Sequence, residues 1–167
     1  MLFLAQLPLS SHPDPQLAAR DQMLLLFQCQ SDPGMCDDWE ADSGGNAALL
    51  AASGEVPMVA PAGTLALSTH TSVAFRSYEE VEGGETPDDA YCALMDDDPD
   101  VLGKLGGVPL WIQNDETPSC DCGAAMTFFA QIEDRGEGGL NFGDAGAGYA
   151  FVCCTCRTHA KFLWQCS

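Results

Sequence analysis

The chain has 167 residues, 46% of them hydrophobic, which is enough for one domain with a substantial core. Six basic and 25 acidic side chains give a formal net charge of −19, which argues against nucleic-acid binding, because that affinity comes largely from Lys and Arg. The same charge disfavours anionic membrane surfaces. No apolar run approaches the roughly 20 residues of a membrane span, and the apolar start lacks the features of a signal peptide, so we expect a cytoplasmic protein.

The beginning of the sequence reappears near its end. Residues 1–7 (MLFLAQL) match residues 126–132 (MTFFAQI) at Met, Phe, Ala and Gln, at an offset of 125 positions. A second pair, residues 27–29 (FQC) and 151–153 (FVC), follows in the same order at an offset of 124. The alternative is that short apolar strands simply look alike. The two collinear matches favour one supersecondary unit used twice, with each copy burying its apolar face against the other.

Strand-like segments dominate the rest of the sequence. In chain order they are residues 2–7, 23–30 (which could equally be helical), 56–60, 64–69, 71–78, 108–113, 125–133, 148–154 and 160–165. The first of these is almost wholly apolar, so we expect it to be buried on both faces. Residues 31–53 are acidic and small, with a Gly-Gly pair, and predict no regular element.

Two short helices are expected between these segments. One follows Pro15 over residues 16–21, and the other begins at Thr86-Pro87 and ends near Pro99. The sequence therefore predicts a mainly β fold, α+β at most, with an internally duplicated β-sheet unit. We expect a single domain over residues 1–167, with repeat halves at about 1–60 and 104–167 joined by 61–103.

The nine cysteines are clustered. Four-coordinate zinc needs four soft donors, and Cys120, Cys122, Cys153 and Cys156 supply them from two neighbouring turns. The one-residue gap between the first two is a less common spacing, and buried free thiols or a redox disulfide are the alternatives. Cys154 could replace its neighbour, and His159 is a reserve donor. Such a zinc would be structural, since four protein ligands leave no open position for catalysis.

We expect no metal elsewhere in the chain. Cys29 and Cys36 lie in the matching region of the first half, but the residues that would complete a site are absent from the sequence before Met1. We therefore interpret these two, together with Cys92 and Cys166, as core or surface thiols. The three histidines (His12, His70 and His159) stand in no catalytic motif, and the sequence shows no catalytic constellation.

Several segments together resemble one protein family. The chain resembles the bacterial YwqG-like proteins in residues 104–113 (KLGGVPLWIQ), the pair Cys120 and Cys122, residues 126–132, residues 142–153 and residues 162–166 (FLWQC). More distantly, they are similar to the two units of programmed cell death protein 2. The resemblance is dense over residues 104–167, thinner over residues 1–39 and nearly absent between.

The resemblance implies an all-β unit duplicated within one chain, the halves exchanging strands as a dimer would. It also implies roles in protein–protein contact, as chaperones for a ribosomal protein or as immunity proteins against toxins, and no enzymatic activity. Relative to the family, the first half lacks the segment equivalent to residues 108–113. We expect the natural start to lie upstream, because the strand at 2–7 would otherwise have an unpaired edge; a strand supplied by a partner is the alternative.

Two functions follow from these features. The favoured one is a non-enzymatic interaction module, chaperone-like or immunity-like, that binds a basic client protein on its acidic surface. The alternative is a thiol- or metal-dependent enzyme that uses Cys153, Cys154 and Cys156 as reactive thiols. Thiolate chemistry requires a nearby cation, and Arg157, His159 and Lys161 are the local candidates.

Overall fold

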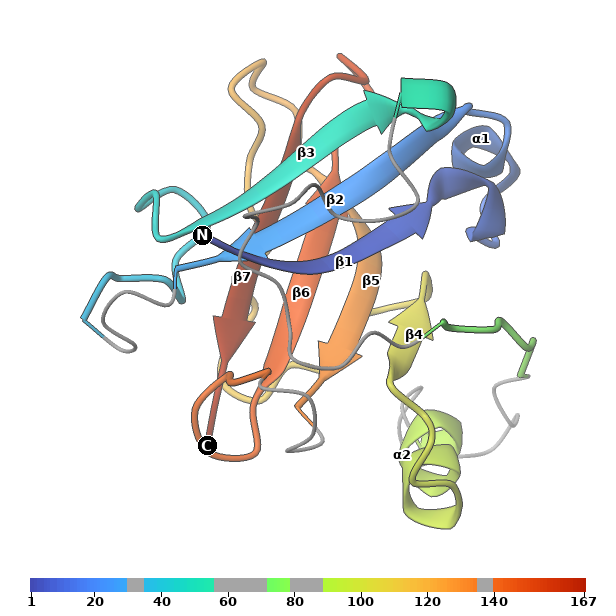
Figure 1. Cartoon of the computed structure of the whole chain (residues 1–167), viewed down its shortest axis with the longest axis vertical. Coiled ribbons are helices and arrows are strands. Elements are labelled where there is room, and N and C mark those ends of the chain that lie inside the picture. Colours follow the sequence, from blue (N-terminus) through green and yellow to red (C-terminus); the bar gives the residue numbers. More distant parts are fainter. Residues whose placement is uncertain (30–34, 56–71, 79–88, 135–139) are drawn as a thin grey trace.

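The computed structural model describes residues 1–29, 35–55, 72–78, 89–134 and 140–167, and in these ranges the fold is mainly β, as expected. Two antiparallel sheets are present, one in the order β1-β2-β3 and one in the order β4-β5-β6-β7 (Figure 1). The strands are β1 (Leu2–Pro8), β2 (Gln22–Gln28), β3 (Asn46–Ala52), β4 (Gly103–Leu105), β5 (Thr127–Glu133), β6 (Ala147–Val152) and β7 (Ala160–Gln165). Short helices complete the fold: α1 (Pro15–Ala18), α2 (Asp89–Asp97) and the 3-10 turns η1 (Leu9–Ser11) and η2 (Ser53–Glu55).

The two sheets pack face to face, with the strands of one crossing those of the other obliquely (Figure 1). A single core lies between them. Its buried members include Leu4, Leu7, Leu24 and Leu26 from the first sheet and Phe129, Val152, Phe162 and Trp164 from the second. Each sheet therefore removes the apolar inner face of the other from water, which is the main stabilising term for such a sandwich.

The strand pairing of the first sheet is repeated in the second. Phe3 pairs with Phe27 across β1 and β2, and Phe128 pairs with Phe151 across β5 and β6. Each strand pair then has a bulge within the two residues after its first Phe. The ring centroids of the two aromatic pairs are 5.5 and 5.7 Å apart. Since register and bulge agree as well as sequence, the two sheets contain the same unit, as the repeat predicts.

The repeated unit contains a third strand that the sequence comparison missed. β3 pairs with β2, as β7 pairs with β6, starting from Asn46 opposite Gln28 and from Ala160 opposite Val152. Residues 46–52 (NAALLAA) are rich in Ala and Leu, which favour helices in isolation. Pairing with β2 and packing against the core override that preference.

The outer face of the second sheet is covered by the chain that precedes β5. A second buried cluster lies there, with Trp111 and Ile112 packed on it. Its buried members include Cys120, Met126, Phe128, Tyr149, Phe151 and Leu163. This segment is held by side chains: Gln131 Oε1 accepts from the Leu110 amide at 2.8 Å, and the Tyr149 hydroxyl donates to the Leu110 carbonyl at 2.7 Å. The second sheet is thus buried on both faces.

The predicted strand at residues 108–113 is therefore wrong. These residues cross the sheet face without joining a ladder, and the strand that flanks β5 is β4. The turn between them is tight: Gly106 has a φ of +68°, and a Cβ there would lie 2.6 Å from the Pro13 ring. Only glycine tolerates both the backbone conformation and the close approach of the first half.

Several other expectations change. β1 is not buried on both faces: its two buried residues, Leu4 and Leu7, both belong to the core between the sheets, and its other residues are only partly buried. Residues 72–78 form no strand, while the predicted strands at 56–60 and 64–69 and the start of the second helix lie outside the described residues. Each sheet is built from strands of one half, so the described strands show no exchange between halves. In the described part of the chain, every helix is too short or too polar to cross a membrane.

Candidate metal centre

Two of the four predicted ligands lie in a tight turn just before β5. The turn is closed at its base by a bridge between Ser119 and Ala125. Within it, the Cys120 amide donates to the Ala124 carbonyl at 2.8 Å, and the Gly123 amide donates to the Cys120 carbonyl at 2.8 Å. Gly123 has a φ of +85°, the left-handed conformation that such a turn requires. This turn places both Cys120 and Cys122 beside the end of β6.

The other two ligands lie in the hairpin between β6 and β7. The Cys153 amide donates to the His159 carbonyl at 2.9 Å, which closes the loop. Inside it, the Cys156 amide donates to Cys153 Sγ at 3.4 Å, a contact that holds the backbone of Cys156 beside the Cys153 sulfur. Arg157 follows with a φ of +62°, so the chain reverses immediately after the pair. The two-residue gap thus places both sulfurs on one side of the hairpin.

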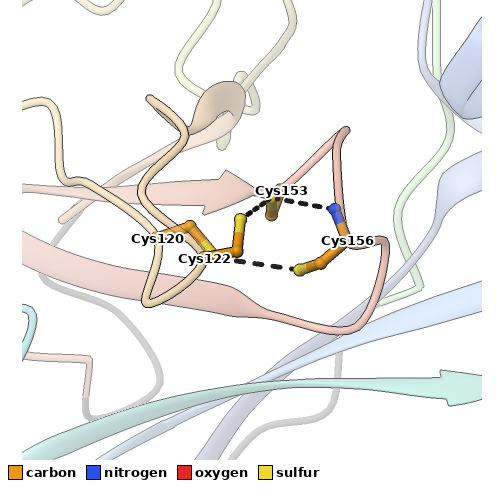
Figure 2. Close-up of side chains that lie close together, drawn as sticks. All are labelled: Cys120, Cys122, Cys153 and Cys156. Carbon is orange, nitrogen blue, oxygen red and sulfur yellow. Dashed lines mark hydrogen bonds between the residues drawn. The ribbon is translucent and has the colours of Figure 1, made fainter.

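The four sulfurs converge on one point (Figure 2). Cys122 Sγ lies 3.6 Å from Cys153 Sγ, and Cys120 Sγ lies 3.7 Å from Cys156 Sγ. All four lie within 4.8 Å of one another. The structure therefore brings together the complete set predicted from the sequence, with the one-residue gap of Cys120 and Cys122 accommodated by the tight turn. Four sulfurs in this arrangement could bind a metal ion.

The four side chains differ in exposure. Cys120 and Cys153 are buried, Cys156 is partly buried and Cys122 is exposed. The buried pair belongs to the outer apolar cluster of the second sheet, so the site is continuous with the core of that half. An ion held here would link the turn before β5 to the hairpin after β6.

The two reserve ligands behave differently. His159 Nδ1 lies 3.2 Å from Cys120 Sγ and 3.7 Å from Cys156 Sγ, at the margin of the group. Cys154 Sγ instead accepts from the Thr127 hydroxyl at 3.2 Å and packs against the core between the sheets. Cys153, and not Cys154, therefore joins the converging set.

Local hydrogen bonds change the proton affinities of these thiols. Bonds from the hydroxyl and the backbone of Thr158 lower the pKa of the Cys156 thiol to about 5. The Cys156 backbone amide likewise lowers the pKa of Cys153. At Cys120 the Cys122 backbone acts in the same direction, but burial and the neighbouring sulfurs outweigh it and raise the pKa to about 12. The hairpin thus favours thiolates, which are the form that binds metal.

The first half carries a thiol pair at the equivalent place. Cys29 corresponds to Cys153 in the repeat, and its amide donates to the Gly45 carbonyl as the Cys153 amide does to His159. Cys29 Sγ lies 3.3 Å from Cys36 Sγ. In the part of the chain that the structure describes, the one group of three or more potential ligands is the set in the second half.

Two charged side chains outside the cysteine set contact the loops that carry the cysteines. Sequence reasoning missed both contacts. Lys161 Nζ lies 2.6 Å from Asp42 of the first half and 3.8 Å from Asp121, the residue between Cys120 and Cys122. On the other loop, Arg20 of the first half donates from Nη2 to the Arg157 carbonyl at 2.7 Å. The sequence indicates Lys161 only as a cation near reactive thiols, and nothing in the local sequence around Arg20 indicates a role.

Comparison with known proteins adds little to this geometry. No protein-family model and no solved structure matches the chain. The uncharacterized protein YpfL of Salmonella typhimurium (strain LT2) is 34% identical to it over 75 residues. That stretch covers 40% of this chain and 16% of YpfL, so the chain spans about 16% of the length of this relative. The similarity covers too little of either protein to assign a family.

Proposed function

We propose that this chain is a non-enzymatic protein-binding module whose second half is stapled by one structural zinc ion. The observation that carries the proposal is the closed set of four sulfurs from Cys120, Cys122, Cys153 and Cys156. Thiolates are soft ligands that suit zinc, and a tetrahedral ion with four protein ligands keeps no position for a substrate or an activated water. The metal then holds two loops together and does no chemistry.

The charge of the surface supports a basic client. Exposed acids among the described residues include Asp21, Asp37, Glu40, Asp42, Glu55, Asp96, Asp97, Asp100, Asp115, Glu116, Asp121 and Asp144. The exposed cations in the same ranges are Arg76, which pairs with Asp98, and Arg157. A surface of one sign attracts a partner of the other sign and accelerates its encounter. The resemblance to the YwqG-like proteins supports the same kind of role, as a chaperone or an immunity protein.

Two variants with equal charge loss test whether this surface binds the client. Asp37→Asn/Glu40→Gln removes two negative charges from the loop between β2 and β3, and Asp96→Asn/Asp97→Asn removes two from the end of α2. We expect the immobilised protein to retain a basic partner at low salt, to release it as salt rises, and to lose it in one of the two variants. Unchanged binding in both variants and at high salt would contradict a charge-driven interaction, and retention of no protein from several lysates would contradict the module itself.

A thiol-dependent enzyme is the second candidate, favoured by the exposure of Cys122 beside Cys153 Sγ at 3.6 Å. Alkylation followed by mass spectrometry separates the two. Because Cys122 is exposed, burial cannot protect it, so its protection reports a bound metal. We expect Cys122 to react only after a chelator has removed the ion. Rapid alkylation in the protein as purified, with no metal bound, would favour the enzyme.

A further inference from the structure

Half of the basic residues of this acidic chain lie around the cysteine centre. The sequence has six Lys and Arg residues against 25 acids. Arg157 belongs to the hairpin that carries Cys153 and Cys156, Lys161 reaches the turn that carries the other two cysteines, and Arg20 reaches the hairpin from the first half. A zinc ion bound by four thiolates carries a net charge of −2, so cations placed around it stabilise it.

Arg20 makes the most specific of these contacts. It lies between α1 and β2, and its side chain crosses from the first half to the second, where Nη2 donates to the Arg157 carbonyl at 2.7 Å. Its Nε donates to Gln22 Oε1 at 2.8 Å, which fixes the plane of the guanidinium. Arg157 has a left-handed φ of +62°, a conformation that costs energy for a residue other than glycine. The bond from Arg20 therefore stabilises the reversal that follows Cys156.

One nitrogen of the Arg20 guanidinium has no acceptor. Its Nη1 is buried and has no hydrogen-bond partner. Burial lowers the pKa of the guanidinium, and so does the positive charge of Arg157, while the negative charges of Cys154, Cys153 and Cys156 act in the opposite direction. A buried cationic donor without an acceptor is unfavourable unless a negative charge lies nearby. A thiolate centre supplies that charge.

We propose that Arg20 is a positioning residue for the metal centre: a cation of the first half that orients the cysteine hairpin of the second half and offsets its charge. The inference rests on the proposed zinc centre. Its consequence is that metal affinity depends on the docking of the two halves, since the first half supplies the bond. Outer-shell partners of this kind change metal affinity by about 10- to 100-fold.

The test is a competition titration of zinc against a chromophoric chelator, with the full chain and three variants. We expect Arg20→Gln to weaken zinc binding by about 10-fold or more. Arg20→Lys should show a smaller loss, because it keeps the charge but not the planar fork. Arg76→Gln is the control, since Arg76 is an exposed arginine paired with Asp98 outside the centre, and it should bind zinc as the wild type does.

Melting temperatures with and without zinc distinguish positioning from packing. We expect Arg20→Gln to reduce the increase in melting temperature that zinc produces, and to lower the melting temperature of the metal-free protein by less than that of the zinc-bound protein. Equal losses with and without zinc, or a zinc affinity equal to that of the wild type, would overturn the role of Arg20 while leaving the staple intact. A wild-type chain that binds no zinc would overturn the staple and this inference with it.

Discussion

The two halves of this protein share a unit of three strands but stabilise it by different means. In the second half, the sheet is buried on both faces and its hairpin joins a group of four cysteines. In the first half, β1 is not buried on both faces, and the equivalent hairpin carries the pair Cys29 and Cys36. One strand framework therefore supports two loop chemistries, and the residues around the framework decide which half can hold a metal.

The largest expected effect is a difference in stability loss between substitutions at the equivalent cysteines of the two hairpins. Cys153→Ser removes one of four ligands and should lower the free energy of unfolding by about 5 kcal/mol, or about 10–20 °C in Tm at 2–4 °C per kcal/mol. Cys29→Ser changes the equivalent position without touching the centre and should cost less than about 1 kcal/mol. Calorimetry of both variants in the presence of zinc measures the difference. Equal losses would mean that the second hairpin gains nothing from a metal.

The equivalent aromatic pairs should differ as well. Phe128 is 8% exposed and belongs to the outer cluster of the second sheet, whereas Phe3 is only partly buried. We expect Phe128→Ala to cost about 3–5 kcal/mol and Phe3→Ala about half of that, because less apolar area is lost at the first site. Urea denaturation of both variants measures the costs. If Phe3→Ala proved as costly as Phe128→Ala, the outer face of the first sheet would be as well covered as that of the second.

A glutamine recurs at the same position in both units. Gln131 is 3% exposed and accepts from the Leu110 amide, while Gln6 is partly exposed. Gln131→Leu leaves that partly buried amide without its acceptor and should destabilise the protein by about 1–3 kcal/mol. Gln6→Leu should change stability by no more than about 0.5 kcal/mol. Chemical denaturation compares the two, and a neutral Gln131→Leu would show that the segment before β5 needs no such anchor.

The smallest effect concerns a histidine between the halves. His12 comes from the first half and stacks on Phe129 of the second, with ring centroids 5.0 Å apart. Burial lowers the pKa of His12 below its usual 6.5. Between this lowered pKa and 6.5 the unfolded chain binds a proton more readily than the folded chain does, so the free energy of unfolding falls as pH falls through that window.

A substitution isolates that effect. In the wild type, the Asp14 amide donates a hydrogen bond to His12 Nδ1 at 3.0 Å. His12→Asn keeps an acceptor for this amide but has no group that titrates near neutral pH. We expect the free energy of unfolding of the variant to fall less steeply than that of the wild type as pH decreases below 6.5. Thermal melts across that range provide the measurement. Parallel pH profiles for the two proteins would show that His12 is not responsible.

Much of this fold could be predicted from the sequence, because the repeat preserves its informative residues. Phe3 and Phe128 occupy equivalent positions, each in an aromatic pair followed by a bulge. Because both halves need the same residue types there, the repeat remains visible in the sequence. β3 could not be predicted, because its Ala and Leu residues favour another structure until β2 is beside them. Residues 108–113 have strand composition but cover a sheet face, a difference that depends only on tertiary position.

The site shows the same division. The four cysteines could be predicted from their clustering and the chemistry of thiolates, and the structure brings all of them together. Arg20 could not be predicted, because its bond to the Arg157 carbonyl joins residues that are far apart in the chain. A contact of this kind is set by the docking of the two sheets and leaves no local pattern in the sequence.

Native mass spectrometry tests the central claim most directly, by counting the zinc ions on the wild type, Cys122→Ser and Cys36→Ser. Cys122 is the exposed member of the centre, so its substitution removes a ligand with little effect on packing. The account predicts one zinc ion on the wild type and on Cys36→Ser, and none on Cys122→Ser. A wild type without zinc, or one whose zinc is retained in Cys122→Ser and lost in Cys36→Ser, would contradict it.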